Sequence, residues 1–264
     1  PICDAITLKH VPLTGGYRLL RLQAPAIAGP ARPGQFVHLR IPGLEPTALR
    51  RPFSIYRAEA GELSILYKRV GRGTEMLATL QEGTTVSLMG PLGNGFPLTD
   101  GTTKPVLIGG GYGVAPLVFL ASRLPRKGVI LMGGRSAGDL LCIEDFEALG
   151  WPVETATEDG SRGTRGYVTA LLERHLESTD AAPELFACGP DGMLRAVGAR
   201  AIATGCRAWL SLMPTFCVMS WTNLSTSVLL CLPNTDFPEA QAVMVDTERR
   251  TALRLRRPGA PRPV

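Results

Sequence analysis

The spacing of the apolar segments changes near residue 104, and this change constrains the fold more than any other feature of the chain. Before it, five short β-rich segments follow one another at about ten-residue spacing: YRLLRL, GQFVHLRI, RRPFSIYRA, GELSILYKRV and TTVSLMG. This spacing is typical of an antiparallel barrel or sandwich. The segment GTEMLATLQ has helical spacing instead, so we expect it to cap one end of the barrel.

After residue 104, strands and helices alternate. KPVLIGGGYGVAPLVFLASRL has the pattern of a buried strand, a glycine turn and a helix; KGVILMGGRS with the acidic DLLCIEDFEAL repeats this unit, and PVETATED, VTALLERHL and PELFACGP continue it. Such alternation predicts a parallel sheet with helices on both faces. The fold class expected is therefore an antiparallel β-barrel over residues 1–100, followed by a parallel-sheet α/β domain over residues 101–212, with the polar linker LTDGTT between them.

The bulk properties exclude several classes of function. The chain has 264 residues and a formal charge of +5, much of it between Arg249 and Arg262. That excess is too small to indicate nucleic-acid binding, and no nucleic-acid motif accompanies it. Residues 208–235 carry no charged side chain, but Pro214, Asn223 and many Ser and Thr residues argue against a membrane helix. We expect no membrane span and no signal peptide.

Six cysteines are scattered along the chain without a disulfide-type spacing, which favours a reducing cytoplasm. They are Cys3, Cys142, Cys188, Cys206, Cys217 and Cys231.

The strongest motif is GGGYGVAP, residues 109–116, between a strand and a helix. Glycines at this position allow the backbone to approach a pyrophosphate, and the following helix N-terminus provides free N–H groups. A single glycine turn in a βα unit is often only a tight turn, and this one is not the GxGxxG pattern of the usual dinucleotide fold.

Two further motifs lie in the barrel half. RRPFSIY, residues 50–56, places an arginine and a serine on a strand, where they can meet a phosphate and a ring heteroatom. ILYKRVGRGT, residues 65–74, opens a second glycine loop before a helix. Taken alone, the first motif is equally an edge strand with a surface arginine, and Arg69 and Arg72 are equally part of a solvated face.

FACGPDGML, residues 186–194, lies at the carboxyl end of a predicted strand, where ligands gather in open parallel sheets. Cys188 is by default an inert core thiol. If it lies opposite Gly110 across the sheet, it lines a nicotinamide site instead.

In this order, RPFS, YKRVGRGT, GGGYGVAP and CGPDGM resemble the ferredoxin–NADP reductase superfamily. The segments ARPGQFVHLRIPG, TEDGSRGTRGYVT and ACGPDGML are most similar to the electron-transfer subunits of class B dihydroorotate dehydrogenases. The resemblance extends from about residue 5 to residue 212.

The resemblance implies a role for each motif. FAD is held by Arg51, Pro52, Phe53 and Ser54, by Leu66, Tyr67 and Lys68, and by Gly73 and Thr74. The nicotinamide dinucleotide, NAD(H), is received as substrate by Gly110, Gly111, Gly113 and Pro116. Gly189 and Pro190 line the hydride-transfer site together with Cys188, the one residue assigned to catalysis.

The same resemblance implies a 2Fe–2S cluster held by four cysteines near the C-terminus, with three of them in a C-x4-C-x2-C run. This chain has no C-x-x-C, and its last three cysteines are 11 and 14 residues apart. The metal ligands are therefore unknown. Residues 213–264 form a divergent tail in place of the cluster segment, and its arginine- and proline-rich end suggests a frameshift near Leu212; a truly divergent tail is the alternative.

The expected function is electron transfer from NADH through FAD, and in the family through the cluster, to an FMN-type catalytic dihydroorotate dehydrogenase subunit in pyrimidine biosynthesis. The resemblance implies a heterotetramer with that subunit. Two alternatives stay open: a related reductase subunit serving a ferredoxin- or hydrogenase-type acceptor, and a non-catalytic scaffold subunit. No acidic residue is placed securely enough to decide between NADH and NADPH.

Overall fold

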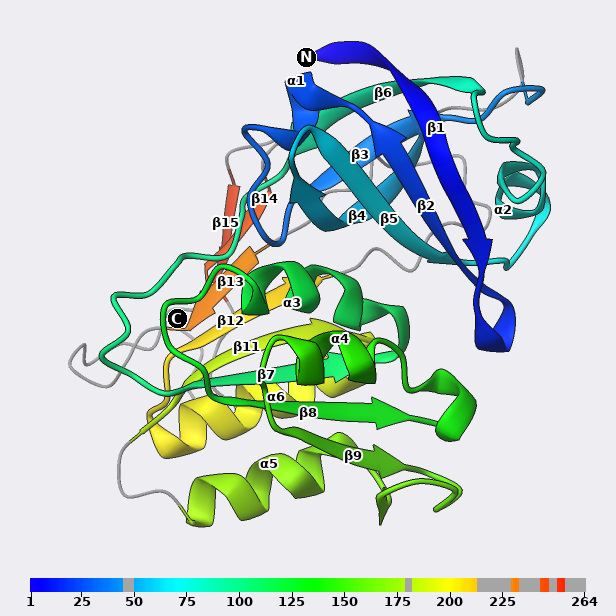
Figure 1. The fold of residues 1–264 in the computed structure, drawn as a ribbon. Coiled ribbons are helices and arrows are strands. Elements are labelled where there is room, and N and C mark those ends of the chain that lie inside the picture. The colour runs from blue at the N-terminus through cyan, green and yellow to red at the C-terminus, as the bar shows by residue number, and fades with distance from the viewer. Residues whose placement is uncertain (45–49, 179–181, 213–228, 233–242, 247–250, 255–264) are drawn as a thin grey trace, which may run out of the picture.

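The computed structural model describes residues 1–44, 50–178 and 182–212, and the backbone of three short strands at 229–232, 243–246 and 251–254. Two bodies are evident in Figure 1: a barrel built from the N-terminal half, and a layered α/β body beneath it.

Six antiparallel strands close into the barrel in the order β1-β2-β5-β4-β3-β6. They are β1 (Ile2–Pro12), β2 (Tyr17–Gln23), β3 (Phe36–Arg40), β4 (Arg51–Glu59), β5 (Glu62–Lys68) and β6 (Thr85–Leu92), with the short helix α1 (Pro25–Ala28) after β2. All five β-rich segments of the sequence, and the N-terminal segment, are strands of this barrel, so the predicted antiparallel barrel is confirmed.

Alternating apolar side chains fill the barrel, and a helix closes one end. Leu20, Leu22, Ile55 and Ile65 are fully buried in one cluster. Helix α2 (Arg72–Leu77) places Leu77 in the same cluster, also fully buried. The cap expected over residues 73–81 is therefore present, although the helix ends at Leu77 because turn-type hydrogen bonds replace the helical ones beyond it.

In the described part of the chain, nine strands form the second sheet, in the order β10-β9-β8-β7-β11-β12-β13-β14-β15. The strands from β10 to β12 are parallel: β7 (Pro105–Gly110), β8 (Val129–Gly134), β9 (Val153–Thr157), β10 (Thr164–Arg165), β11 (Glu184–Gly189) and β12 (Ala208–Leu212). The predicted parallel sheet is thus confirmed.

Helices cover both faces of this sheet. α3 (Val114–Ala121) and α4 (Ile143–Ala148) lie between the sheet and the barrel, and α5 (Val168–Glu177) and α6 (Asp191–Thr204) lie on the far face (Figure 1). The central strand β7 is buried at every position, with Leu107 in the core beneath α3 and Val106 and Ile108 in the core above α5 and α6. Burial on both faces explains why this strand is a continuous apolar run in the sequence.

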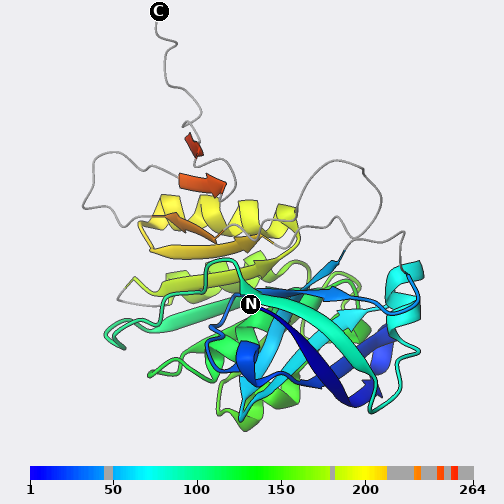
Figure 2. The same cartoon turned by 90° about the horizontal axis from the view of Figure 1, so that it is seen from above.

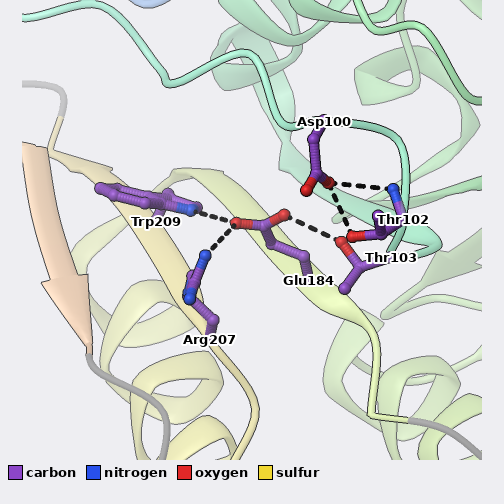
Figure 3. Close-up of polar contacts among 6 residues, drawn as sticks. All are labelled: Asp100, Thr102, Thr103, Glu184, Arg207 and Trp209. Carbon is purple, nitrogen blue, oxygen red and sulfur yellow. Dashed lines mark hydrogen bonds and ion pairs between the residues drawn. The ribbon is translucent and has the colours of Figure 1, made fainter.

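A buried carboxylate fixes the start of β11 between the interdomain linker and β12 (Figure 3). Glu184 is 3% exposed. Its Oε2 accepts a hydrogen bond from Thr103 Oγ1 at 3.1 Å, and its Oε1 accepts one from Trp209 Nε1 at 2.7 Å. Arg207 Nη1 lies 3.9 Å from Oε1. These donors offset the desolvation of the carboxylate and connect the linker to the sheet.

The tail predicted to be divergent, residues 213–264, lies for the most part outside the described residues. Three short antiparallel strands within it, β13 (Leu229–Leu232), β14 (Val243–Asp246) and β15 (Thr251–Arg254), extend the sheet beyond β12, as the orange strands of Figure 2 show. Of the uncharged segment 208–235, the described residues belong to β12 and β13. Within the described ranges, no helix combines the length and apolarity needed to cross a membrane.

Candidate functional site

The barrel group of predicted site residues lies where strands β4 and β5 separate. The pairing of β4 with β5 ends at Ile55–Ile65. The preceding residues of β4, Arg51 to Ser54, pair with β3 instead, whereas Leu66, Tyr67 and Lys68 stay paired with β2. The RPFS segment and the LYK segment therefore lie at the two sides of a divergence in the barrel wall. The resemblance assigns both segments to one FAD, and this arrangement would allow a single ligand to contact the RPFS and LYK segments together.

The predicted residues on β5 do not share a face. Leu66 belongs to the apolar cluster between barrel and sheet. The Tyr67 ring points into the barrel, 5.8 Å from the Phe53 ring centroid, and its hydroxyl lies 2.8 Å from His10 Nε2. Burial raises the pKa of Tyr67 to about 12. Tyr67 and Phe53 thus belong to the barrel core, and the part of Tyr67 nearest a ligand on the outer face is its main chain.

Arg51 carries an unsatisfied donor beside the second glycine loop. Its Nε is buried and has no hydrogen-bond partner within the part of the chain that the structure describes. A Cβ added to Gly73 would lie 3.7 Å from that Nε and 3.6 Å from Ile41 Cδ1, so the glycine leaves space beside the guanidinium. A buried donor without an acceptor costs about 1–3 kcal/mol, and a phosphate oxygen is a suitable acceptor.

Thr74 builds this loop with its side chain. Its hydroxyl donates to the Gly71 carbonyl at 2.9 Å and accepts from the main-chain N–H groups of Val70 (2.9 Å) and Gly71 (3.2 Å). One donor and two acceptor sites are all that a hydroxyl has. Thr74 therefore shapes the turn ahead of α2, and its hydroxyl has no capacity left for a ligand in this conformation.

The sheet group forms where the glycine turn after β7 packs against the end of β11. Gly109 and Cys188 are register partners across the parallel strands. A Cβ at Gly113 would lie 2.4 Å from the Cys188 carbonyl oxygen, and one at Gly110 would lie 2.8 Å from Pro190 Cδ. The turn and the CGP segment are therefore in backbone contact, and glycine is the residue that permits it.

Cys188 is fully buried within this contact. Burial raises the pKa of its thiol to about 12, and a hydrogen bond with Ser211 only partly counteracts that effect. A neutral, enclosed thiol is neither nucleophile nor proton donor at neutral pH. The catalytic role predicted for Cys188 remains a prediction, and the structure is compatible with it only as a wall of the site. Pro116 is likewise buried, within the first turn of α3.

Contacts not anticipated from the sequence connect the two groups. Lys68 Nζ lies 3.5 Å from Asp139 Oδ1, which joins the barrel to the turn after β8, and it also lies 4.7 Å from the Tyr17 ring centroid. Tyr17 Oη would be 3.9 Å from a Cβ at Gly111, and burial raises its pKa to about 12. Tyr17 follows a TGG turn without a motif. Asp139 begins the segment DLLCIEDFEAL that was expected to be helical, but the structure places it in the turn before α4, which starts at Ile143, so nothing in the sequence indicated a contact of either residue.

A cleft of about 1060 Å³ lies beside these groups, not over them. Its walls come from β2, β4, β5 and the β1–β2 turn of the barrel, and from the segment after β8, the start of α4 and Arg162 in the sheet domain. Of the predicted site residues, Leu66 is the one that lines it. Arg57 forms an ion pair with Asp145 across this lining. The cleft therefore lies between barrel and sheet but apart from the RPFS segment.

The cysteines of the described ranges do not match a 2Fe–2S cluster. Cys3, Cys142, Cys188 and Cys206 are free thiols, and two of them are buried. No group of three or more His, Cys, Asp or Glu side chains suited to a metal ion occurs among the described residues. Cys217 lies outside them, and only the backbone of Cys231 is described, in β13.

Comparison with known proteins agrees with this geometry. Residues 107–199 match the family model "Oxidoreductase NAD-binding domain". The dihydroorotate dehydrogenase B (NAD(+)) electron transfer subunit of Geobacillus kaustophilus is 41% identical over 176 residues, which are 64% of this chain and 67% of the relative. The subunit of the same name from Desulforamulus reducens is 38% identical over 201 residues, covering 74% of this chain and 76% of the relative.

Solved structures show the same two-part architecture. The structure of an NADH-dependent reduced ferredoxin–NADP oxidoreductase, described in connection with flavin-based electron bifurcation, superposes with a TM-score of 0.72 at 25% identity and covers 86% of this chain and 82% of that one. An Amycolatopsis cytochrome P450 reductase superposes with a TM-score of 0.64 at 27% identity, covering 77% and 67%. The extent and identity of these matches place the chain in a defined family: it belongs to the electron transfer subunits of dihydroorotate dehydrogenase B (NAD(+)).

Proposed function

We propose that this chain is an oxidoreductase subunit that takes electrons from NADH through FAD and delivers them to a catalytic dihydroorotate dehydrogenase subunit. The names of its relatives support the reaction. The observation that carries the proposal is the buried Nε of Arg51, which has no hydrogen-bond partner among the described residues and lies beside the side-chain-free Gly73. An unpaired cationic donor in such a place is stabilised by an anionic ligand, and the pyrophosphate of FAD supplies one.

In this proposal the barrel holds FAD. The Arg51 guanidinium and the Gly73 loop bind the pyrophosphate, and the diverging edges at Ser54 and at Leu66–Lys68 hold the ring system. Pro52 and Phe53 support it from the strand and the barrel core. Thr74 fixes the loop through its three hydrogen bonds, so its contribution is the shape of the phosphate site.

The sheet domain receives the dinucleotide. Gly110, Gly111 and Gly113 form the turn on which the pyrophosphate of NADH lies, and Pro116 supports the start of α3 from below. Cys188, Gly189 and Pro190 form the wall beside the nicotinamide. FAD held by these residues would supply the hydride-accepting chemistry between NADH and the next electron carrier. The protein's own task is to align the two rings. The ion pair of Lys68 with Asp139, and the Tyr17 ring under Lys68, hold the barrel against the sheet domain.

Other parts of the proposal concern the assembly. We assign FAD binding to residues 1–100 and NAD binding to residues 101–212, and we propose a heterotetramer with an FMN-type catalytic subunit in pyrimidine biosynthesis. A cytoplasmic location is consistent with the free thiols. Because the cysteine set does not fit a 2Fe–2S cluster, no step of this mechanism passes through one.

Two neighbouring arginines allow a matched test. Arg51→Gln removes the unpartnered donor, whereas Arg50→Gln removes an arginine that already donates to Ser87 O (2.8 Å) and Ser87 Oγ (2.9 Å). A charged hydrogen bond contributes about 1.5–3 kcal/mol, so Arg51→Gln should raise the Kd for FAD roughly 10- to 150-fold. Arg50→Gln should leave it within about threefold. Equal effects of the two substitutions would contradict the assignment of the phosphate site.

The rivals are separated by the purified full-length protein. A yellow protein whose flavin absorbance is bleached by NADH supports the reductase, and a colourless protein that stays apo with added FAD supports a scaffold. Mixing the reduced protein with a catalytic dihydroorotate dehydrogenase subunit, a ferredoxin or a hydrogenase subunit then identifies the acceptor. Reoxidation by the dehydrogenase subunit is the result expected.

A further inference from the structure

One imidazole joins the two ends of the loop that carries the proposed phosphate site. His10, on β1, lies under α2 at the capped end of the barrel. Its Nε2 is 2.8 Å from the hydroxyl of Tyr67, at the end of β5, and its Nδ1 is 3.2 Å from the carbonyl oxygen of Leu80, just beyond α2. The segment between these two partners, residues 68–79, contains Gly73 and Thr74.

The partners determine the protonation of this ring. Arg18 Nε donates to His10 Nε2 at 3.2 Å, and a guanidinium is a permanent donor. Nε2 must therefore be the unprotonated acceptor, shared by Arg18 and the Tyr67 hydroxyl, and the single proton lies on Nδ1, where it is donated to Leu80 O. The neutral Nδ1–H tautomer donates to Leu80 O and offers its one Nε2 lone pair to Arg18 and Tyr67, whereas an imidazolium would point a second N–H at Arg18.

We propose that His10 is a positioning residue for the cofactor: it clasps the phosphate-binding loop at its base, through Tyr67 on one side and Leu80 on the other. Among the described residues, the loop is also held by Leu77, which is fully buried in the barrel core, and by two sets of hydrogen bonds. Thr74 braces its tip from within, and Arg69 N donates to Gly16 O at 3.0 Å. Without the imidazole, Tyr67 at the end of β5 and Leu80 after α2 no longer hydrogen-bond to a common residue. The distance between the two ends of the loop, and with it the position of Gly73 beside Arg51, is then less constrained.

The clasp acts on the phosphate end of the ligand, not on its ring system. Loss of His10 should therefore weaken the binding of FAD much more than the binding of riboflavin, which has the same ring but no phosphate. A purely structural role in the barrel would weaken both equally or lower stability alone. This comparison gives the proposal a readout of its own.

This inference rests on the proposed function, and the experiment separates the two. Titration of the full-length apoprotein with FAD and with riboflavin, followed by flavin fluorescence, compares wild type with His10→Phe, His10→Gln and the control His175→Gln, a substitution on α5 of the sheet domain. His10→Phe keeps an aromatic ring but loses the hydrogen bonds; we expect roughly tenfold weaker FAD binding and riboflavin binding changed less than twofold. His10→Gln, which retains one donor and one acceptor, should recover most of the loss.

A pH profile gives the second readout. Among the described residues, Arg18 on β2 and Tyr67 on β5 are the charged and titratable groups that contact the ring, and Arg69 after β5 acts on Tyr67. Burial lowers the pKa of His10; the hydrogen bond to Leu80 O partly opposes this effect, and Arg18 lowers the pKa further. FAD affinity should therefore fall as the pH drops below 6.5, and His10→Gln should remove the fall. His38 pairs with Pro52 of the RPFS segment, and burial lowers its pKa too. Its protonation could therefore change FAD affinity over the same pH range, so the profile is measured in a His38→Gln background.

The outcomes are distinct. If wild type binds no FAD, the proposed function is wrong. If wild type binds FAD and His10→Phe binds it equally well, or if His10→Phe loses FAD and riboflavin in the same proportion at unchanged thermal stability, the clasp is wrong. If His10→Phe does not fold, His10→Gln is the test instead: its affinity for FAD must then be independent of pH between 5 and 7, and a remaining dependence contradicts the proposal.

Discussion

Replacing Gly113 with alanine should damage both the fold and the reaction, and the size of the effect follows from one contact. A Cβ at this position would lie 2.4 Å from the Cys188 carbonyl oxygen, 2.7 Å from its carbonyl carbon and 2.8 Å from Gly189 Cα. The first distance is about 1 Å short of the 3.4 Å at which ordinary contact begins. The φ of Gly113 is −63°, which any residue adopts, so the exclusion is purely steric.

Backbone atoms on both sides leave no flexible side chain to move away, so the turn and the end of β11 must separate by about 1 Å. Overpacking of a core usually costs 1–3 kcal/mol, and we expect about 3 kcal/mol here because the obstacle is main chain. For a chain of this size, that lowers the Tm by roughly 6–12 °C. A displacement of 1 Å between reacting groups costs on the order of 100-fold in rate.

Thermal unfolding and stopped-flow bleaching of FAD by NADH measure the two effects. The matched control is Gly192→Ala on α6, where a Cβ meets nothing within 4 Å. It should leave the rate unchanged and raise stability slightly, since alanine is the better helix former. If Gly113→Ala kept the wild-type Tm and bleaching rate, the steric argument for the paired turn and CGP segment would be refuted.

Four further outcomes are expected. Cys188→Ala should keep the NADH bleaching rate within about threefold and show no new dependence between pH 7 and 9.5, because the thiol is buried and neutral; a larger loss would restore a chemical role to the thiol. Glu184→Leu should cost about 2–4 kcal/mol in urea unfolding, because Thr103 and Trp209 lose their acceptor, and an unchanged urea midpoint would count against that network. Burial lowers the pKa of all three histidines, so the unfolded chain binds more protons between the lowered values and 6.5. The free energy of unfolding should therefore decrease as the pH falls from 6.5 through the lowered pKa values, and its dependence on pH should be weaker when all three histidines are replaced by glutamine. Iron and acid-labile sulfide should be far below two per chain in the purified protein, and stoichiometric amounts would show that the distant cysteines do assemble a cluster.

Local patterning was sufficient to predict the elements and the motifs. Strand spacing before residue 104 and strand–helix alternation after it indicated the barrel and the parallel sheet, because burial period and turn composition are local properties. GGGYGVAP and FACGPDGML each lie at a strand end, and parallel strands bring such ends together, so their meeting was also predictable.

Side-chain direction and long-range partners were not predictable. The resemblance assigns Tyr67 to the flavin site but does not say which part of the residue faces it; strand alternation turns the ring into the barrel toward His10 and leaves the main chain on the outer face. The pairing of Lys68 with Asp139 and the position of Tyr17 beside Gly111 join segments that are far apart in the chain, and no local pattern encodes such contacts. They depend on how the barrel docks on the sheet.

By itself the sequence determined which residues have the chemistry: an arginine and serine on a strand, two glycine loops, a cysteine at a strand end, and a cysteine spacing that does not suit a cluster. Only the tertiary structure decided which of these side chains can contact a ligand. Packing left Arg51 Nε buried without an acceptor and at the same time enclosed the Cys188 thiol. Availability depends on what surrounds a group in three dimensions, and that environment is assembled from segments whose order along the chain does not specify their contacts.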